Sequence, residues 1–193
     1  MASDRGPLAP CTPRQESKLD LIKQAGFNPS DMAAELAQLE DTIDYRFRKR
    51  ELLEQAVTHS SYSRAPTPSA NNERLEFLGD SILGFIVSER LSAQFPTRPE
   101  GELTKLRASL VSAANLVKVA EALDIGAYLR LGRGEEISGG REKKTLLVNA
   151  FEALVAAVYL DGGIEAACQL VGGTVLTVTA LDGAVENLAL DNR

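Results

Sequence analysis

Cysteine and histidine are scarce in this 193-residue sequence, which contains two cysteines, Cys11 and Cys168, and one histidine, His59. The cysteines are far apart and form no Cys-x-x-Cys or Cys/His spacing, so neither a disulfide scaffold nor a zinc site is indicated. Unpaired thiols suit a reducing compartment, and we therefore expect a cytoplasmic location. No GxSxG motif is present, and an isolated histidine at a helix end favours a packing role over catalysis.

Long apolar runs are also missing. No stretch approaches the roughly 20 apolar residues that a membrane helix requires, and no apolar segment follows a basic one at the N-terminus. A membrane partner is therefore not expected. Positive charge is in short supply as well, because 21 Lys and Arg residues stand against 27 Asp and Glu, a formal net charge of −6. This balance argues against nucleic-acid binding by bulk charge alone.

Alternating strand patterns are rare, whereas helical periodicity runs through most of the chain, so the predicted fold class is all-α. The longest predicted helix covers 73–95 and ends at Pro96 and Pro99. A second strong helix covers 145–163 and ends at two glycines. The other predicted helices cover 17–27, 28–43, 48–59, two stretches within 101–129, and 164–181. The predicted organisation is a tail over 1–32, one domain over 33–181 and a tail over 182–193.

Three carboxylates share one face of the predicted 73–95 helix. At 100° per residue, Glu73, Glu76 and Asp80 fall within a sector of about 60°. Clustered anions on a largely apolar helix repel one another and require cations, either basic side chains or a metal. The alternative is a solvated acidic stripe with Arg74 and Arg90 nearby, since runs of charge usually are solvated faces.

The predicted 145–163 helix carries a second polar pair. Asn149 and Glu152 are the only strongly polar residues between Leu146 and Leu160, and their spacing puts them on one face. A lone glutamate on such an apolar helix is seldom buried unless it is paired or binds a metal. These two residues could simply bond to Arg or Lys in a helix contact. If the two helices pack together, however, Glu76 and Asp80 would join them in one cluster of oxygen ligands.

Oxygen-only ligands of this kind select magnesium, with manganese as a substitute, over zinc. Such a centre suits phosphoryl-transfer chemistry, in which a metal activates water and neutralises charge on phosphate oxygens. The glycine-rich segment 130–144 has no P-loop ending and no preceding strand. It is predicted to be a loop that contacts nucleic-acid phosphates through four basic residues: Arg133, Arg141, Lys143 and Lys144.

The segment NERLEFLGDSILGF, from Asn72 to Phe85, resembles the signature of the ribonuclease III family. Similar segments occur in the family's order on either side of it: LLEQAVTHSSYS, FPTRPEGELTKLRASLVSAANL, LRLGRGEEISGG and LLVNAFEALVAAVYLDGG. The resemblance covers roughly Leu39 to Leu181. It implies an all-helical nuclease domain that works as a homodimer and cuts double-stranded RNA with magnesium, leaving short 3′ overhangs.

The resemblance also implies roles for individual residues. Glu76 matches a metal-ligand glutamate, Asp80 the catalytic aspartate, and Glu152 a glutamate that binds metal and is needed for cleavage. Glu73 and Glu100 match acidic positions that support the centre across the dimer. Where the family most often has aspartate, this chain has Asn149, whose amide oxygen can bind metal but brings no charge, so weaker metal binding is expected.

Three functional hypotheses are consistent with these patterns. The first is a magnesium-dependent endoribonuclease that processes rRNA or mRNA precursors. The second, favoured by Asn149, is a catalytically impaired module that binds double-stranded RNA or associates with the ribosome. The third is a purely structural helical dimerisation module, which would leave the carboxylates without a cation. The match ends without the family's double-stranded RNA-binding domain, so weak, strongly salt-dependent RNA binding is expected, with readout of duplex shape rather than base sequence.

Overall fold

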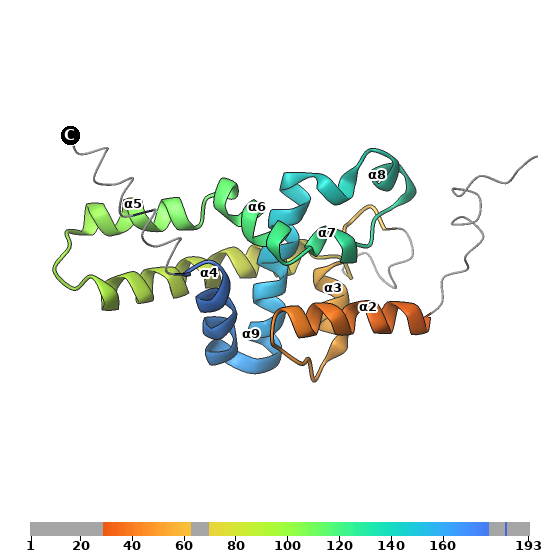
Figure 1. The fold of residues 1–193 in the computed structure, drawn as a ribbon, viewed down its shortest axis with the longest axis horizontal. Helices are drawn as coiled ribbons and strands as arrows, with labels where there is room; N and C mark the ends of the chain where they lie inside the picture. Colours follow the sequence, from red (N-terminus) through yellow and green to blue (C-terminus); the bar gives the residue numbers. More distant parts are fainter. Residues whose placement is uncertain (1–28, 63–69, 178–183, 185–193) are drawn as a thin grey trace, which may run out of the picture. The chain divides into compact units, whose positions relative to one another are not determined.

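The computed structural model describes residues 29–62, 70–177 and 184. Within them every regular element is a helix, and the only β feature is an isolated bridge between Thr58 and Arg130, which confirms the predicted all-α class (Figure 1). The chain divides into two compact units, Met1–Ala33 and Ala34–Arg193, and the second contains nearly all of the described residues. The predicted helix over 17–27 lies outside the described residues, as do residues 1–28 of the predicted N-terminal tail and all of the predicted C-terminal tail except Ala184.

The longer helices lie near their predicted positions, whereas the number of short helices differs from the prediction. They are α2 (Pro29–Thr42), α3 (Arg50–Ala56), α4 (Glu73–Gln94), α5 (Glu100–Leu110), α6 (Ala113–Ala122), α7 (Ile125–Tyr128), α8 (Arg133–Ile137), the short 3₁₀ helix η1 (Gly140–Glu142) and α9 (Lys144–Thr174). The segment expected to hold two helices contains three, because the short α7 follows α5 and α6. The segment expected to be a loop contains α8 and η1.

Helix α4 begins and ends where the sequence predicts. Asn72 precedes its first turn, and Phe95 ends it just before Pro96, which cannot continue a helix. Its buried apolar residues recur every three or four positions and form the stripe that faces the core: Leu75, Ile82, Leu83, Ile86, Val87 and Leu91.

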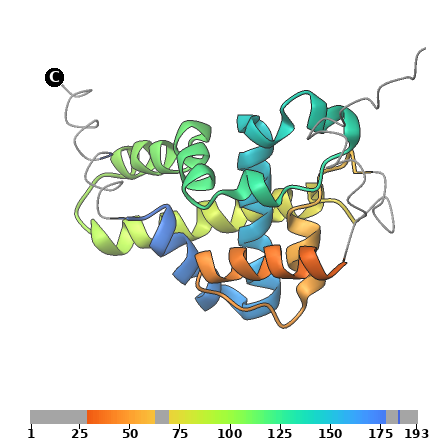
Figure 2. The same ribbon diagram turned by 45° about the vertical axis from the view of Figure 1, so that its right-hand side comes forward.

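Helix α9 is the centre of the core, and α4 crosses it (Figures 1 and 2). The α4–α9 contact is the largest between any two elements, and α3 and α6 also pack on α9. Every residue from Ala153 to Val158 is buried. By length and composition alone α9 could span a membrane, although 56% of its most apolar 18-residue window is buried inside the protein. An apolar helix surrounded by other helices in this way is a core helix.

The backbone of α9 leaves the helical conformation at Gly163, where φ is 83° and ψ is −173°. Glycine adopts this positive φ without the strain that a Cβ would cause. The sequence predicted that the 145–163 helix ends at Gly162 and Gly163. In the structure this position is a break within the longer helix α9. The part after the break ends at Thr174, earlier than the predicted Leu181, and residues 178–181 lie outside the described residues.

Asp161, two residues before this break, forms hydrogen bonds to the segment that precedes α3. Its carboxylate accepts hydrogen bonds from Tyr45 Oη at 2.8 Å and from the backbone N–H groups of Arg48 at 2.9 Å and Lys49 at 2.8 Å. Burial alone would raise the pKa of Asp161, but these bonds lower it below its ordinary value. The acid before the glycine pair thus anchors a distant loop.

Candidate functional site

The two long helices α4 and α9 approach each other closely at Gly79. A Cβ on Gly79 would stand 1.8 Å from the carbonyl oxygen of Glu152, so the two backbones touch without a side chain between them. Only glycine permits such an approach. Gly79 was not among the site residues predicted from the sequence; the available signal was a glycine inside an otherwise apolar helix, one residue from Asp80.

This crossing brings together the two polar groups predicted from the sequence. Burial raises the pKa of Glu152 to about 7, and the charges of Asp80 and Glu76 add to the effect. Burial also raises the pKa of Glu76, as does the charge of Glu73, while a hydrogen bond from the Asn149 side chain opposes the rise. Glu76 and Asp80 of α4 therefore face Asn149 and Glu152 of α9.

The exposure of these side chains differs along the cluster. Glu73 and Asp80 are exposed, whereas Glu76, Asn149 and Glu152 are partly buried. Within the described ranges, no Lys or Arg forms an ion pair with any of the four carboxylates. The Asn149 side chain lowers the pKa of Glu76, and among the described residues it does not form the hydrogen bond to a basic residue that the simplest structural alternative supposed.

The donor set at this crossing consists of carboxylate and amide oxygens, which fits magnesium or manganese in chemistry and charge. Among the residues that the structure describes, however, no three His, Cys, Asp or Glu side chains stand close enough to hold a metal ion as they are. A cation would have to draw these side chains together. The unbalanced negative charge and the raised pKa of Glu152 favour such a change, since a cation relieves both.

Glu100 lies apart from this cluster within one chain. It begins α5, accepts a hydrogen bond from Thr104 Oγ1 at 2.7 Å, and lines a small cleft of about 170 Å³ with Ser88 and Arg107. Ser88 belongs to the second half of α4, about three turns beyond Glu76. Of the two supporting acids, only Glu73 acts on the cluster directly, through its charge on Glu76.

The four predicted phosphate contacts divide into two pairs. Arg141 donates to the carbonyls of Gly126 and Ala127 and to Glu136, and Lys143 pairs with Glu135. Both side chains therefore hold α8 and η1 in place, so the predicted loop is wrong as to structure, and a contact of these residues with phosphate stays a prediction. Two cations, Arg133 and Lys144, are exposed and form no side-chain bond to the described residues.

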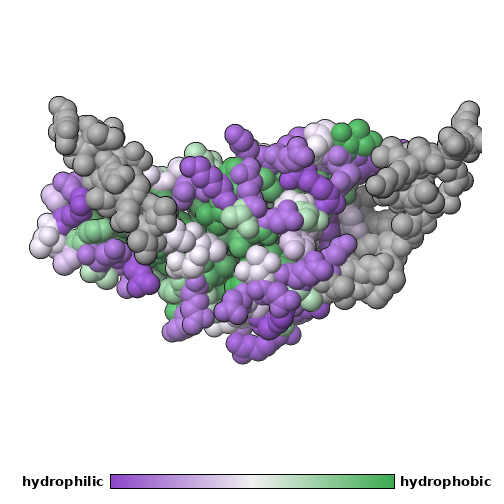
Figure 3. Space-filling view, viewed as in Figure 1, coloured by the Kyte–Doolittle hydropathy of each residue, from purple (hydrophilic) through white to green (hydrophobic). Residues whose placement is uncertain are grey.

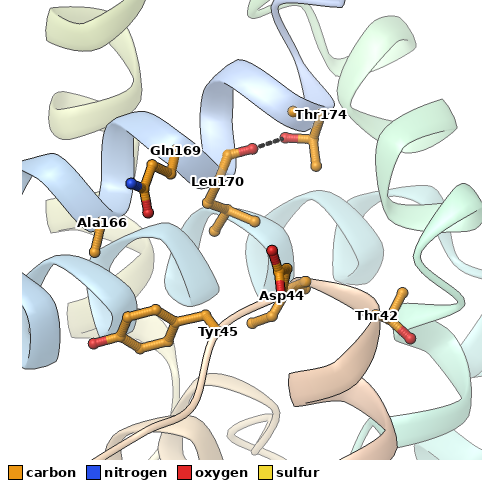
Figure 4. Close-up of a pocket in the computed structure, with 9 residues that line it drawn as sticks. Thr42, Asp44, Tyr45, Ala166, Gln169, Leu170 and Thr174 are labelled. Carbon is orange, nitrogen blue, oxygen red and sulfur yellow. Dashed lines mark hydrogen bonds between the residues drawn. The ribbon is translucent and has the colours of Figure 1, made fainter.

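A larger hollow lies elsewhere in the domain (Figure 4). This pocket of about 410 Å³ opens between the end of α2 with its following loop and the last turns of α9. Tyr45 points its hydroxyl to Asp161, and Thr174 Oγ1 donates to the Leu170 carbonyl at 2.7 Å. The only carboxylate lining this pocket is that of Asp44, so the pocket does not compete with the α4–α9 crossing as a catalytic centre.

Large apolar side chains are exposed at a few places. Phe77 and Phe85, about two turns apart on α4, are 80% and 59% exposed, and Ile137 of α8 is 77% exposed. Figure 3 shows one isolated hydrophobic group over α8 and a mostly hydrophilic rim on that face. The α4 phenylalanines form an apolar surface beside the carboxylate cluster.

Comparison with known proteins gives consistent matches. A family model described as Ribonuclease-III-like matches residues 49–178. Ribonuclease 3 of Solibacter usitatus is 55% identical over 152 residues, which cover 75% of this chain and 56% of that protein. Ribonuclease 3 of Magnetococcus marinus is 52% identical over 142 residues, covering 70% and 58%. The chain thus spans a little more than half the length of these relatives.

Solved structures match over the same region. The crystal structure of the nuclease domain of ribonuclease III from Campylobacter jejuni has a TM-score of 0.68 and 38% identity, and covers 72% of this chain and 92% of that one. A second structure of that nuclease domain, which describes flexibility in a region involved in dimer formation, has a TM-score of 0.66 at 38% identity. It covers 72% of this chain and 98% of that one.

Proposed function

Because the chain belongs to the ribonuclease-III-like family, we propose that it is a divalent-metal-dependent endoribonuclease that hydrolyses double-stranded RNA and leaves short 3′ overhangs. The observation that carries the proposal is the crossing at Gly79, where oxygen donors of α4 and α9 meet with no described cation to balance them. Processing of rRNA or mRNA precursors in the cytoplasm is the expected setting.

Four residues would hold the metal: Glu76, Asp80 and Glu152 through carboxylates, and Asn149 through its amide oxygen. A bound Mg²⁺, or Mn²⁺ in its place, would supply Lewis-acid activation of water and neutralise charge on the phosphate. Burial and neighbouring charge raise the pKa of Glu152 to about 7 without the cation, and the bound cation would favour the ionised carboxylate that serves as its ligand. Asp80 and Glu152 are the residues proposed to be essential for cleavage.

The decisive experiment compares the chain with its Glu152→Gln variant on a long RNA duplex in magnesium. The amide preserves the size of the side chain but removes its charge and its capacity to take up a proton. We expect cleavage to fall by at least about a hundredfold, while the circular dichroism spectrum and oligomeric state stay unchanged. Undiminished cleavage by the variant would contradict the assignment of the site.

Asn149 supports a second candidate, a catalytically impaired module that binds duplex RNA or the ribosome on the same scaffold. It reduces the formal negative charge of the four-residue set to three, and its side chain lowers the pKa of Glu76. The retention of Glu76, Asp80 and Glu152 favours the active enzyme. Cleavage seen only after Asn149→Asp, in magnesium and in manganese, would identify the impaired module.

The active form is proposed to be a homodimer. Phe77 and Phe85 leave apolar surface exposed on α4, with the small residues Ser81 and Gly84 between them, and exposed aromatic patches of this kind mark protein interfaces. A two-fold pairing through α4 would set two carboxylate clusters on one assembly, one for each RNA strand. Glu100, remote from its own cluster, would then support the other one.

A further inference from the structure

His59 lies in a segment that is fixed from two sides. Its backbone N–H donates to the carbonyl of Arg130 at 3.0 Å, and the N–H of Arg130 donates to Val57 at 2.8 Å. The N–H of Gly132, two residues after Arg130, donates to Ser61 Oγ at 2.9 Å. A Cβ on Gly132 would stand 2.2 Å from the Ser61 carbonyl oxygen, so glycine is required for this contact.

The same segment is also tied to the carboxylate helix. The carbonyl of Thr58 accepts from the N–H of Asn72, the residue immediately before α4, at 2.8 Å. Thr58 and Asn72 are both buried, at 3% exposure. His59 therefore occupies a rigid connection between the carboxylate-bearing end of α4 and the segment that leads into α8.

The hydrogen bonds of the ring determine its tautomer. The backbone N–H of Ser61 donates to His59 Nδ1 at 3.2 Å, and a backbone N–H can only donate. Nδ1 is therefore an acceptor, and the proton of the neutral ring resides on Nε2. Ser61 Oγ lies 2.9 Å from the same nitrogen and fixes the ring plane. Among the described residues, Nε2 has no hydrogen-bond partner, and the side chain is partly exposed.

The His59 segment lies near two carboxylate-bearing elements. The bond between Thr58 and Asn72 holds it at the start of α4, which carries Glu76, and the bond between Ser61 and Gly132 holds it at the start of α8, which carries Glu135. These carboxylates repel the phosphates of an approaching RNA strand. A hydrogen-bond donor beside them can bind a phosphate oxygen and offset part of this repulsion.

We propose that the Nε2–H of His59 donates a hydrogen bond to a backbone phosphate oxygen of the RNA strand beside the carboxylate cluster, and so positions the duplex for cleavage. The inference rests on the proposed function for its substrate. His59 is a positioning residue in this scheme, because the carboxylates and the metal they hold carry the chemistry.

Two substitutions distinguish the role of the His59 Nε2–H group from that of the hydrogen bond between the Ser61 N–H and His59 Nδ1. In His59→Asn, the side-chain oxygen can still accept from the Ser61 N–H, but no group reaches the position of Nε2. In His59→Gln, the longer side chain carries an N–H to about that position. Duplex binding is measured by fluorescence anisotropy in magnesium, with Glu152→Gln present in every variant so that the RNA stays intact.

We expect His59→Asn to weaken duplex binding about tenfold, the size of one hydrogen bond to a charged group, and His59→Gln to restore most of it. Melting temperatures of both variants should match the parent. Binding by His59→Asn as tight as the parent would overturn the inference, and so would an equal loss in both variants accompanied by lower melting temperatures, which indicates a structural role.

A second measurement tests the phosphate itself. Duplexes carry one neutral methylphosphonate linkage, moved position by position along the strand. At one linkage His59→Asn should no longer weaken duplex binding, because the methylphosphonate has already removed the charge of the phosphate that accepts the hydrogen bond. The same loss of affinity at every linkage would overturn the assignment. Failure of the proposed function is seen separately, as absence of cleavage by the unsubstituted chain, since these assays measure binding alone.

Discussion

At the scale of single residues, Asn149 is the feature that most distinguishes this site. An aspartate there would add a fourth carboxylate to the proposed metal ligands Glu76, Asp80 and Glu152. Burial and neighbouring charge already raise the pKa of Glu76 and of Glu152, whereas the Asn149 side chain lowers that of Glu76. We therefore expect the amide to favour the stability of the metal-free protein and to weaken its affinity for the metal.

We expect Asn149→Asp to lower the melting temperature of the metal-free protein and to raise magnesium affinity by about tenfold, as an added carboxylate ligand should. Isothermal titration calorimetry measures the affinity, and differential scanning calorimetry the melting temperature. Gln38→Glu, which adds the same charge at an exposed position of α2, is the control and should change neither. Weaker magnesium binding by Asn149→Asp would contradict the proposed ligand set.

Glu152 gives the metal-free protein a pH dependence of defined sign. Burial and the charges of Asp80 and Glu76 raise its pKa to about 7 in the folded state, above its ordinary value of 4.5. The folded state thus holds the proton more tightly than the unfolded state. Its stabilising contribution is fully present below about pH 4.5 and is lost as pH rises through about 7.

Denaturant unfolding without metal should therefore show a loss on the order of 1–2 kcal/mol between pH 5 and pH 8 that Glu152→Gln lacks, after allowance for solvent screening of a partly exposed group. Added magnesium should reverse this loss at pH 8 and have little effect at pH 5. The same pH profile in the parent and in Glu152→Gln would rule out this residue as its source.

At the scale of elements, the helix crossing depends on a glycine. Gly79→Ala would set a methyl group against the Glu152 carbonyl at 1.8 Å, and backbone on both sides leaves no room to adjust. We expect a loss of several kcal/mol in the free energy of unfolding, or failure to fold. Gly172→Ala in α9 is the control, since nothing lies within 4 Å of its Cβ; it should stabilise the protein by up to about 1 kcal/mol.

The carboxylate of Asp161 joins the break in α9 to the loop after α2. Asp161→Asn keeps one acceptor oxygen for three donors, so we expect a loss of about 1–2 kcal/mol in urea unfolding at pH 7. Because hydrogen bonds outweigh burial and lower the pKa of Asp161, its contribution is present above the ordinary aspartate pKa and is lost as pH falls below it. The difference between parent and variant should therefore shrink at low pH; a constant difference would contradict this role.

Sequence patterns were sufficient for α4 and for the first part of α9, and insufficient for the end of α9 and for the short helices. The apolar stripe of α4, its start at Asn72 and its end at Pro96 are local signals, and all three were correct. The segment 130–144 has no such stripe, because its helices are held by distant groups: Arg141 donates to the carbonyls of Gly126 and Ala127. Such contacts depend on the tertiary fold, and no local periodicity reveals them.

The candidate site was predictable in its residues and not in its geometry. Spacing put Glu73, Glu76 and Asp80 on one helix face and Asn149 beside Glu152, and the family resemblance named the same residues. Neither indicated the backbone contact at Gly79 or the ring geometry of His59, because both arise where segments distant in sequence meet. Their functional roles stay predictions until the variants are measured.

At the scale of the whole molecule, the exposed face of α4 should control assembly. Phe85→Asp would put a charge on the proposed interface, and we expect it to shift the protein from dimer to monomer in sedimentation equilibrium. Ile137→Asp changes an equally prominent apolar residue on α8 and should leave the dimer intact. If Ile137→Asp dissociated the dimer while Phe85→Asp stayed dimeric, the proposed interface on α4 would be wrong.

Net charge at this scale opposes RNA binding, since the chain carries a formal charge of −6. Of the cations expected to contact phosphates, Arg133 and Lys144 are exposed and uncommitted among the described residues, whereas Arg141 and Lys143 are engaged in holding α8 and η1. We therefore expect few counterions to be released on binding, and a shallow dependence of affinity on salt for this domain alone. This revises the steep dependence expected from the sequence.

The contact between Gly79 and Glu152 also constrains when the site can form. About 70 residues separate its two sides, so the site closes only through a long-range encounter, later than the helices themselves. A ribosome must release most of α9 before α4 has a surface to dock on. During synthesis, the carboxylates of α4 and α9 therefore stay apart until both helices have emerged, and the proposed metal site forms only when the two helices dock.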